Sequence, residues 1–248
     1  MDKRLRTKGY TTNRIAPISV PKASDILAEQ LRDLILNGAI RPGGALPPER
    51  ELVVNSGLSR SSVRDALRVL EVEGLIVTKP GRSGGSIVRL PGRETVARPL
   101  ELYVKSHEID LEALLECRFA VEPFLASRAA QHHTEEDLAL IKNIHARFLA
   151  TTDNIAEYKR LNLEWHLAIA QASHNELLIA FMEAISQPIL EATGYHQVTT
   201  AEIRAEAKKA HSAILDSIEK RNAEQAQSRM ARHLGAYMKV AQAILLKP

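Results

Sequence analysis

The sequence predicts a mainly α-helical protein in two parts, a small N-terminal unit with one β-hairpin and then a bundle built from helices alone. Three observations support this fold class. Apolar residues recur at three- and four-residue spacing through most of the 248-residue chain, as in amphipathic helices. Two short β-prone runs occur only within residues 75–90, on either side of a glycine-rich segment. Residues 1–90 hold 15 basic and 9 acidic residues, a net charge of +6, whereas the remainder carries −3.

The composition excludes several classes of protein. With 45% hydrophobic and 25% charged residues, the composition is that of an ordinary globular protein, which excludes disorder throughout the chain. No apolar run approaches the ~20 residues that span a bilayer, so we expect a soluble cytoplasmic protein with no membrane partner. The one cysteine, Cys117, excludes an internal disulfide and a thiolate zinc site. A metal in this protein must therefore depend on other ligands.

The first element after the N-terminus is a helix. Residues 1–20 carry scattered basic side chains without periodicity, which predicts a flexible basic tail. The N-terminal unit then covers residues 21–90. Ser24 is the predicted cap of its first helix, and Asn37-Gly38 ends it.

Two more helices and a hairpin complete the N-terminal unit. A short helix is predicted over 49–55, and Ser59 then caps a longer one over 60–73. The β-prone runs at 75–78 and 86–90 form a hairpin with a glycine-rich tip. Three helices and a hairpin in this order predict a winged helix-turn-helix.

The rest of the chain reads as a helical bundle. We assign residues 91–96 to a linker and 97–248 to the bundle. Thr134 and Asp137 have the spacing of a capping box. Asn222 separates the last two helices. The predicted helices are 97–106, 110–131, 135–151, 154–173, 175–195, 201–220 and 223–246.

The third helix carries a row of arginines. Arg60, Arg64 and Arg68 lie at i, i+4 and i+8 and so share one face. Ser59 and Ser61 add short donors suited to phosphates or base edges. A solvated arginine face would explain the row alone. The short preceding helix, the wing and the positive charge favour DNA as the partner.

The same region resembles the GntR-family winged helix. The resemblance covers residues 20–90 and rests on Leu46-Pro-Pro-Glu-Arg-Glu-Leu52 and on Gly57-Leu-Ser-Arg-Ser-Ser-Val-Arg-Asp-Ala-Leu67. It implies that Arg50, Arg60 and Arg64 read a palindromic operator. It further implies that Ser59 and Ser61 contact phosphates and that Gly81 stands at the wing tip. Arg50 has an alternative role, since it could pair with Glu49 or Glu51.

Histidines in the bundle suggest a second site. Asn162 and His166 lie at i, i+4 on one helix face. His211 and His233 are equidistant from Asn222, so an antiparallel helix pair places them at the same height. Three neutral imidazoles suit zinc, nickel or similar metals. The alternative is a set of ordinary histidines, hydrogen-bonded inside the bundle.

A second resemblance, over residues 97–240, bears on these histidines. Helical effector domains of the FadR type, called FCD domains, place an Asp-x-x-x-His pair on one helix and two histidines on the last two. This order resembles Asn162, His166, His211 and His233, with asparagine in place of the aspartate. The resemblance implies a divalent metal site. Because Asn162 replaces an aspartate, this site has one negative charge fewer than the site of the family. Arg118 corresponds to an arginine that can bind an effector carboxylate; its alternative is a salt bridge with Glu122 at i+4.

These inferences lead to one main hypothesis and two alternatives. We expect a homodimeric transcriptional repressor whose binding to double-stranded operator DNA responds to a small carboxylate effector. In the first alternative the helical domain only dimerises. In the second the protein is a metal-dependent hydrolase, but Glu164 and Glu206 face away from the histidines and the sequence has no H-E-x-x-H motif. We therefore expect no enzyme activity.

Overall fold

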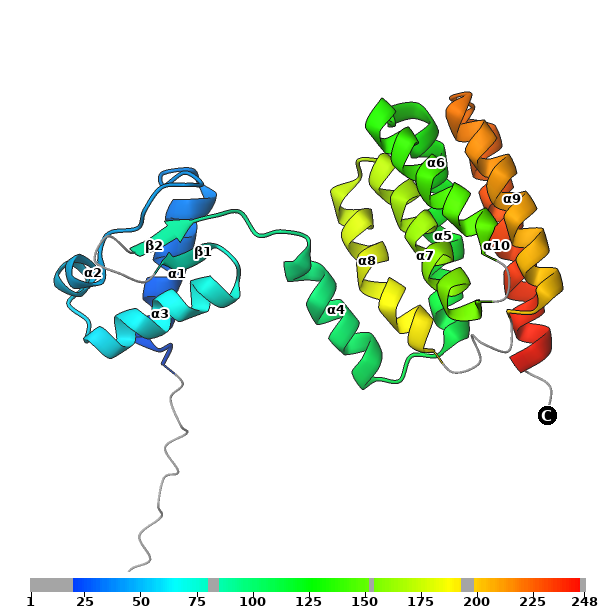
Figure 1. Cartoon of the computed structure of the whole chain (residues 1–248). Coiled ribbons are helices and arrows are strands. Elements are labelled where there is room, and N and C mark those ends of the chain that lie inside the picture. Colours follow the sequence, from blue (N-terminus) through cyan, green and yellow to red (C-terminus); the bar gives the residue numbers. More distant parts are fainter. Residues whose placement is uncertain (1–19, 80–84, 152–153, 193–198, 246–248) are drawn as a thin grey trace, which may run out of the picture. The chain divides into compact units, whose positions relative to one another are not determined.

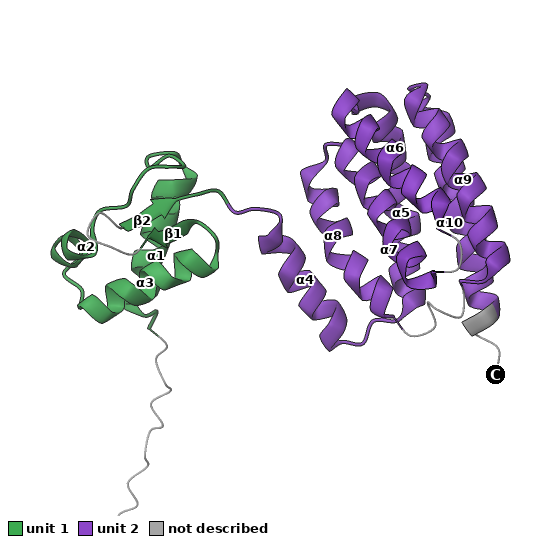
Figure 2. Cartoon of the chain, in the orientation of Figure 1, with its two compact units in different colours: residues 1–90 green, residues 91–248 purple. Residues whose placement is uncertain are grey.

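The computed structural model consists of two compact units, residues 1–90 and residues 91–248 (Figure 2). The structure describes residues 20–79, 85–151, 154–192 and 199–245. Helices dominate these residues, with one two-stranded sheet beside them (Figure 1). The predicted fold class is confirmed. The predicted basic tail, apart from residue 20, and Gly81 lie outside the described residues.

Unit 1 is built around one small core. Helices α1 (Ala23–Leu36) and α2 (Glu49–Ser56) pack against α3 (Arg60–Val72). Strands β1 (Ile76–Lys79) and β2 (Gly85–Val88) pair antiparallel, with Ile76 opposite Val88. The core takes apolar side chains from all of them, including Leu27, Leu31, Leu52, Val63, Leu70, Ile76 and Val88.

The turn between α2 and α3 follows the sequence prediction. Gly57 ends α2 with a φ of 68°, in the left-handed region that glycine adopts at little cost. Ser59 then caps α3, since its hydroxyl accepts a 3.2 Å hydrogen bond from the backbone N–H of Ser62. This tight connection sets α3 against α2 as a helix-turn-helix.

The predicted cap of α1 is wrong. Lys22 occupies the N-cap position, without a side-chain hydrogen bond. Ser24 is buried inside the first turn, and its hydroxyl contacts the carboxylate of Asp25. Ser24 lies one turn before buried Ala28 and on the same helix face, so packing draws it into the helix.

The described part of unit 2 contains seven helices. α5 (Leu111–His132) is the central one and packs against α7, α8, α9 and α10. α4 lies on α8, and α6 lies on α7 and α9 (Figure 1). The other bounds are α4 Glu94–Ser106, α6 Glu135–Ala150, α7 Ile155–Ala172, α8 Glu176–Glu191, α9 Ala201–Glu219 and α10 Ala223–Leu245.

Most predicted helix bounds in unit 2 agree closely with the structure, but the linker over 91–96 is too long. α4 begins at Glu94, inside that segment. Arg93 forms ion pairs with Glu176 and Glu183 of α8, each at 3.6 Å. These contacts bring the start of α4 onto α8, a tertiary effect that local sequence patterns do not contain.

The capping box at the start of α6 is confirmed. The hydroxyl of Thr134 accepts a 3.1 Å hydrogen bond from the backbone N–H of Asp137. The carboxylate of Asp137 accepts one of 2.9 Å from the backbone N–H of Thr134. Two backbone donors that the helix itself cannot satisfy are therefore paired.

The apolar core of unit 2 forms two clusters that share α5, α7 and α10. One also involves α6 and α9, and the other α4 and α8. The buried charged residues of α5, Arg118 and Glu122, lie between Leu115 and Leu125 of the second cluster. Among the described residues, no helix combines the length and hydropathy that crossing a membrane requires.

Candidate functional site

The arginine face of α3 is exposed, as the spacing predicts. Arg60, Arg64 and Arg68 are all solvent-exposed, whereas Val63 and Leu70 of the same helix are completely buried. One side of α3 therefore anchors the helix in the core, and the other presents three cations to an external partner.

An ion pair between α2 and α3 orients one of these arginines. Nε of Arg64 donates a 2.9 Å hydrogen bond to the carboxylate of Glu49. Local sequence patterns contain no signal for this pair, because its members are on different helices. Arg50 is exposed and has no ion-pair partner among the described residues, so its proposed pairing with Glu49 or Glu51 is not observed.

Serine hydroxyls gather at the N-terminus of α3. Oγ of Ser59 lies 2.8 Å from Oγ of Ser61 and 2.9 Å from Oγ of Ser62. The cluster is exposed beside the unpaired backbone N–H groups of the first helical turn, which favour anions. Its chemistry suits a phosphate oxygen.

In unit 2, three histidines from three helices meet inside the bundle. His166 comes from α7, His211 from α9 and His233 from α10, and one ring nitrogen of each lies within 4.8 Å of the others. The Nε2 atoms of His211 and His233 are 3.1 Å apart. The symmetrical positions of these two residues about Asn222 predicted that they lie at the same height.

Aromatic neighbours fix the ring of His211. It stacks on Trp165, with 3.8 Å between ring centroids and 10° between planes. On another side it stacks on Phe148 at 4.8 Å and 25°. His166 approaches it edge-on at 4.9 Å. The histidine orientation is thus set by packing before any ligand binds.

A buried charge pair adjoins the cluster. Nε of Arg118 donates to Oε1 of Glu122, and both side chains are 2% exposed. The other oxygen of Glu122 lies 2.5 Å from Nδ1 of His166. The salt bridge that the i, i+4 spacing allowed is therefore present, and Glu122 also reaches a histidine on another helix.

Burial keeps the three imidazoles neutral. It lowers the pKa of His233 to about 3 and the pKa values of His166 and His211 below the usual range. Burial alone would raise the pKa of Glu122, but the attraction and hydrogen bonds of Arg118 and His166 together outweigh it and lower that pKa to about 2. The site thus holds neutral nitrogen donors beside one compensated carboxylate.

A small cavity of about 20 Å³ lies at the cluster. Of the predicted site residues, Asn162, His166, His233 and Arg118 line it. His211 is completely buried behind them and is not part of the lining. Other lining residues are Tyr158, Thr199, Ile203, Ala207, Leu234 and Tyr237.

The donor set fits a divalent transition metal. Zinc–nitrogen bonds of about 2.0–2.1 Å in a tetrahedral site place two nitrogens roughly 3.3 Å apart. The 3.1 Å between His211 and His233 is close to this value. Nε2 of His166 is buried and has no hydrogen-bond partner among the described residues. A buried nitrogen with a free lone pair is what a metal would satisfy.

Comparison with known proteins identifies both units. A family model described as "Bacterial regulatory proteins, gntR family" matches residues 23–84. The FCD domain model matches residues 113–236, half of the chain. The chain belongs to the GntR family, with an FCD domain. This GntR-family protein is a DNA-binding transcriptional regulator and not an enzyme.

Curated relatives of this GntR-family protein are operon regulators. It is 33% identical over 167 residues to the Glc operon transcriptional activator of Escherichia coli K12, and this match covers 65% of each chain. It is 30% identical over 209 residues to the HTH-type transcriptional regulator LutR of Bacillus subtilis, covering 81% of this chain and 93% of LutR. The HTH-type transcriptional repressor NanR of Escherichia coli is 25% identical over 232 residues, covering 90% of this chain and 86% of NanR.

A solved structure supports the fold. The Streptococcus agalactiae GntR structure aligns with a TM-score of 0.63 at 24% identity, over 87% of this chain and 99% of that chain. Both units of this GntR-family regulator therefore have a counterpart of known architecture.

The sequence assigned no site role to Glu122, and it allowed two places for Tyr158, the lining of the site or the core. Glu122 stood only as the possible partner of Arg118, because i, i+4 spacing says nothing of His166 on another helix. Tyr158 lines the cavity and is also buried in the core. Its position one turn before Asn162 was the signal that could have placed it.

Proposed function

We propose that this regulator is a cytoplasmic repressor that binds a palindromic operator as a homodimer and changes its operator affinity when a small carboxylate binds in unit 2. The observation that carries the effector part is the buried cluster of His166, His211 and His233. Three neutral imidazoles that face one another inside the bundle are more than core packing requires, whereas a divalent metal would use all of them.

The metal would be held by the three histidines, with Asn162 as an oxygen donor. Zinc or nickel suits this donor set best. Such an ion supplies a Lewis-acidic positive charge to which a carboxylate oxygen can bind. Because Asn162 is neutral, the protein itself does not cancel the charge of the ion, which favours an anionic effector.

Arg118 is the proposed effector contact. It lines the cavity and already pairs with Glu122. A guanidinium has five N–H donors in a planar fork, so it can hold Glu122 and still donate to a second carboxylate. The salt bridge therefore holds Arg118 in position for the effector.

In unit 1 we propose that Arg50, Arg60 and Arg64 read bases, while Ser59, Ser61 and the wing at Gly81 contact the DNA backbone and minor groove. The exposure of the arginines and the serine cluster beside the α3 N-terminus support this assignment. Helix-turn-helix proteins commonly use a two-fold dimer to match a palindrome. Repression is the simplest consequence of a protein that occupies operator DNA.

The test is a thermal-shift panel of short carboxylates, run with zinc, with nickel and with chelator. We expect the metal to raise the melting temperature and one class of carboxylate to raise it further only in the metal-loaded protein. Operator binding measured with and without that carboxylate should then differ.

Matched variants sharpen the panel. His211→Phe preserves the stacking with Trp165 but removes a nitrogen donor, so it should lose the metal response. His132→Gln changes an exposed histidine of α5 and should keep it. A melting temperature that changes with neither metals nor carboxylates would favour a helical domain that only dimerises. Equal melting-temperature responses of the two variants to the metal would show that the histidine cluster does not bind it.

A further inference from the structure

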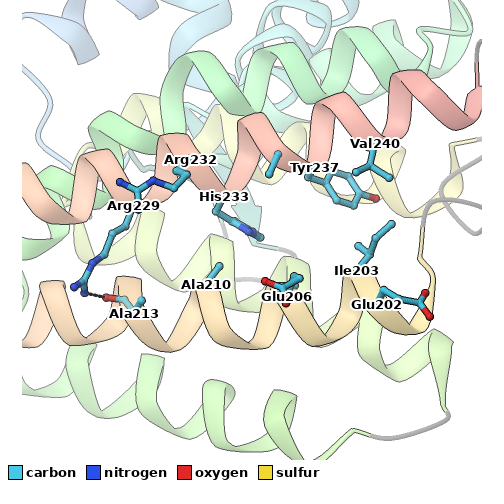
Figure 3. A pocket seen from close by; sticks show the side chains of 12 residues that line it. Glu202, Ile203, Glu206, Ala210, Ala213, Arg229, Arg232, His233, Tyr237 and Val240 are labelled. Carbon is cyan, nitrogen blue, oxygen red and sulfur yellow. Dashed lines mark hydrogen bonds between the residues drawn. The ribbon is translucent and has the colours of Figure 1, made fainter.

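A groove of about 600 Å³ runs between α9 and α10 on the outside of the bundle (Figure 3). It is open to solvent. Its walls are mostly apolar, and its lining also includes the charged residues Glu202, Glu206, Arg229 and Arg232. The lining residues that carry the argument are Ala207, Ala210, Ala213, Ala236, Tyr237 and His233.

The groove and the inner cavity adjoin each other. Both are lined by Ile203, Ala207, His233 and Tyr237. His233 is only partly buried, and in Figure 3 its ring points from α10 toward α9. A molecule in the groove can therefore reach the imidazole that also faces the inner cavity.

The two spaces differ greatly in size. A cavity needs roughly 10–15 Å³ to hold one water, so the inner space of about 20 Å³ accommodates about one water-sized group. The groove of about 600 Å³ lies within the range of ligand pockets, about 300–1,000 Å³. One carboxylate oxygen of an effector can occupy the inner space, but the rest of the molecule needs the groove.

The walls of the groove indicate the chemistry of the part of the effector that lies outside the inner cavity. Three alanines of α9, at positions 207, 210 and 213, follow one another at three-residue spacing and face Ala236 across the groove. Their short side chains leave the space open and offer only methyl groups. The guanidinium of Arg229 binds the backbone oxygen of Ala213 and the hydroxyl of Ser217, so it is engaged in the protein.

We propose that the α9–α10 groove holds the organic body of the effector, so that the regulator selects carboxylic acids with an extended apolar body. One oxygen of the carboxylate reaches the inner cavity beside His233, and the body lies along the alanines. This inference rests on the proposed carboxylate effector of unit 2, and it adds a specificity surface that the histidine cluster does not provide.

The test is calorimetric titration of acetate, butanoate, hexanoate and octanoate into the full-length protein, once zinc-loaded and once with chelator. Each buried methylene should strengthen binding about three- to fourfold until the groove is full. Zinc binding is measured first on the same sample, so loss of the metal site and loss of the groove are recorded separately.

Two variants fill the groove and one serves as the control. Ala210→Leu and Ala236→Leu should weaken octanoate binding at least tenfold and leave acetate binding unchanged. Ala205→Leu adds the same bulk to an exposed position of α9 outside the groove and should bind octanoate like the wild type. Two different groove variants guard against a folding defect in either one.

The results separate two failures. Normal zinc binding with an affinity that does not depend on chain length overturns the groove inference and leaves the metal site intact. Octanoate binding that Ala210→Leu and Ala236→Leu leave unchanged also overturns it. Absence of zinc binding contradicts the proposed metal site. In that case the groove inference is still tested by the way in which affinity depends on chain length in the chelated sample.

Discussion

At the scale of single residues, the charged side chains of this regulator are positioned by partners on other helices. Arg64 of α3 is held by Glu49 of α2. Glu122 of α5 joins Arg118 of the same helix to His166 of α7. Arg64 and Glu49 are not buried, so their ion pair adds little to the free energy of unfolding. Arg118 and Glu122 are buried, so the loss of either partner should lower the free energy of unfolding greatly.

Replacement of Arg64 tests base recognition. Arg64→Ala should weaken operator binding by ~1–3 kcal/mol and relax sequence preference, because a bidentate contact to guanine is lost. Arg64→Lys is the matched variant: it keeps the charge but not the planar fork, so non-specific DNA binding should persist while specificity falls. Gel-shift titrations on operator and unrelated DNA measure both. Unchanged operator affinity in Arg64→Ala would exclude a base contact by Arg64.

Replacement of Glu122 tests the buried charge pair. Glu122→Gln leaves the Arg118 guanidinium buried without its counter-ion, which should lower the free energy of unfolding by ~3–5 kcal/mol. Urea denaturation measures this loss. The double variant Arg118→Met, Glu122→Leu removes both charges and should recover most of the stability. A Glu122→Gln protein as stable as the wild type would show that the pair is not desolvated as the structure indicates.

At the scale of elements, local hydrogen bonds mark where a helix begins or ends, whereas packing determines which neighbours the helix has. Ser59 and Thr134 were recognisable as caps because the capping bond joins residues three apart. Ser24 has the same chemistry and failed as a cap, since burial against the unit 1 core decided its place. α4 likewise begins earlier than the local pattern predicts, next to Arg93, which pairs with Glu176 and Glu183 of α8.

The capping box of α6 gives a prediction at this scale. Thr134→Ala removes the acceptor for the N–H of Asp137 and should lower the free energy of unfolding by about 1 kcal/mol. Thr134→Ser keeps the hydroxyl and should cost little. Thermal unfolding compares the two with the wild type. Equal losses in both would mean that the methyl group, rather than the hydrogen bond, stabilises this end.

At the scale of the whole molecule, the two units differ in their cores and in their net charge. Each unit has its own core, and the charge follows the division, at +6 in residues 1–90 and −3 in the rest. The first unit therefore suits a polyanion, whereas the second buries three histidines beside a charge pair.

The buried histidines make stability of the metal-free protein dependent on pH. Unfolded histidine titrates near pH 6.5, but in the folded chain the pKa of His233 is about 3 and those of His166 and His211 are also lowered. Below pH 6.5 the unfolded state therefore binds more protons than the folded state. The free energy of unfolding should fall on acidification, by up to ~1.4 kcal/mol per pH unit for each such histidine.

Urea unfolding of chelator-treated protein at pH 7.5, 6.5 and 5.5 measures this dependence. The His211→Phe variant has one fewer titrating ring and should lose less stability between pH 6.5 and 5.5. Bound zinc should make the loss steeper, because metal and protons compete for the same nitrogens. Equal stability at pH 7.5 and 5.5 would contradict the neutral, buried state of the cluster.

The sequence by itself determined which segments are helices, the capping at Ser59 and Thr134, and the arginine face of α3. All of these depend on the 3.6-residue period or on contacts within one turn. Even the meeting of His211 and His233 followed from local information, because both are 11 residues from the turn at Asn222.

Only the tertiary structure decided which helices meet. The link from Glu122 to His166, the hold of Glu49 on Arg64, the stacking of Trp165 on His211 and the α9–α10 groove all join different helices. The periodicity of one helix says which side chains share a face, but not which other helix that face will meet. That choice belongs to the packing of the whole bundle, where apolar burial and the pairing of buried charges are satisfied together.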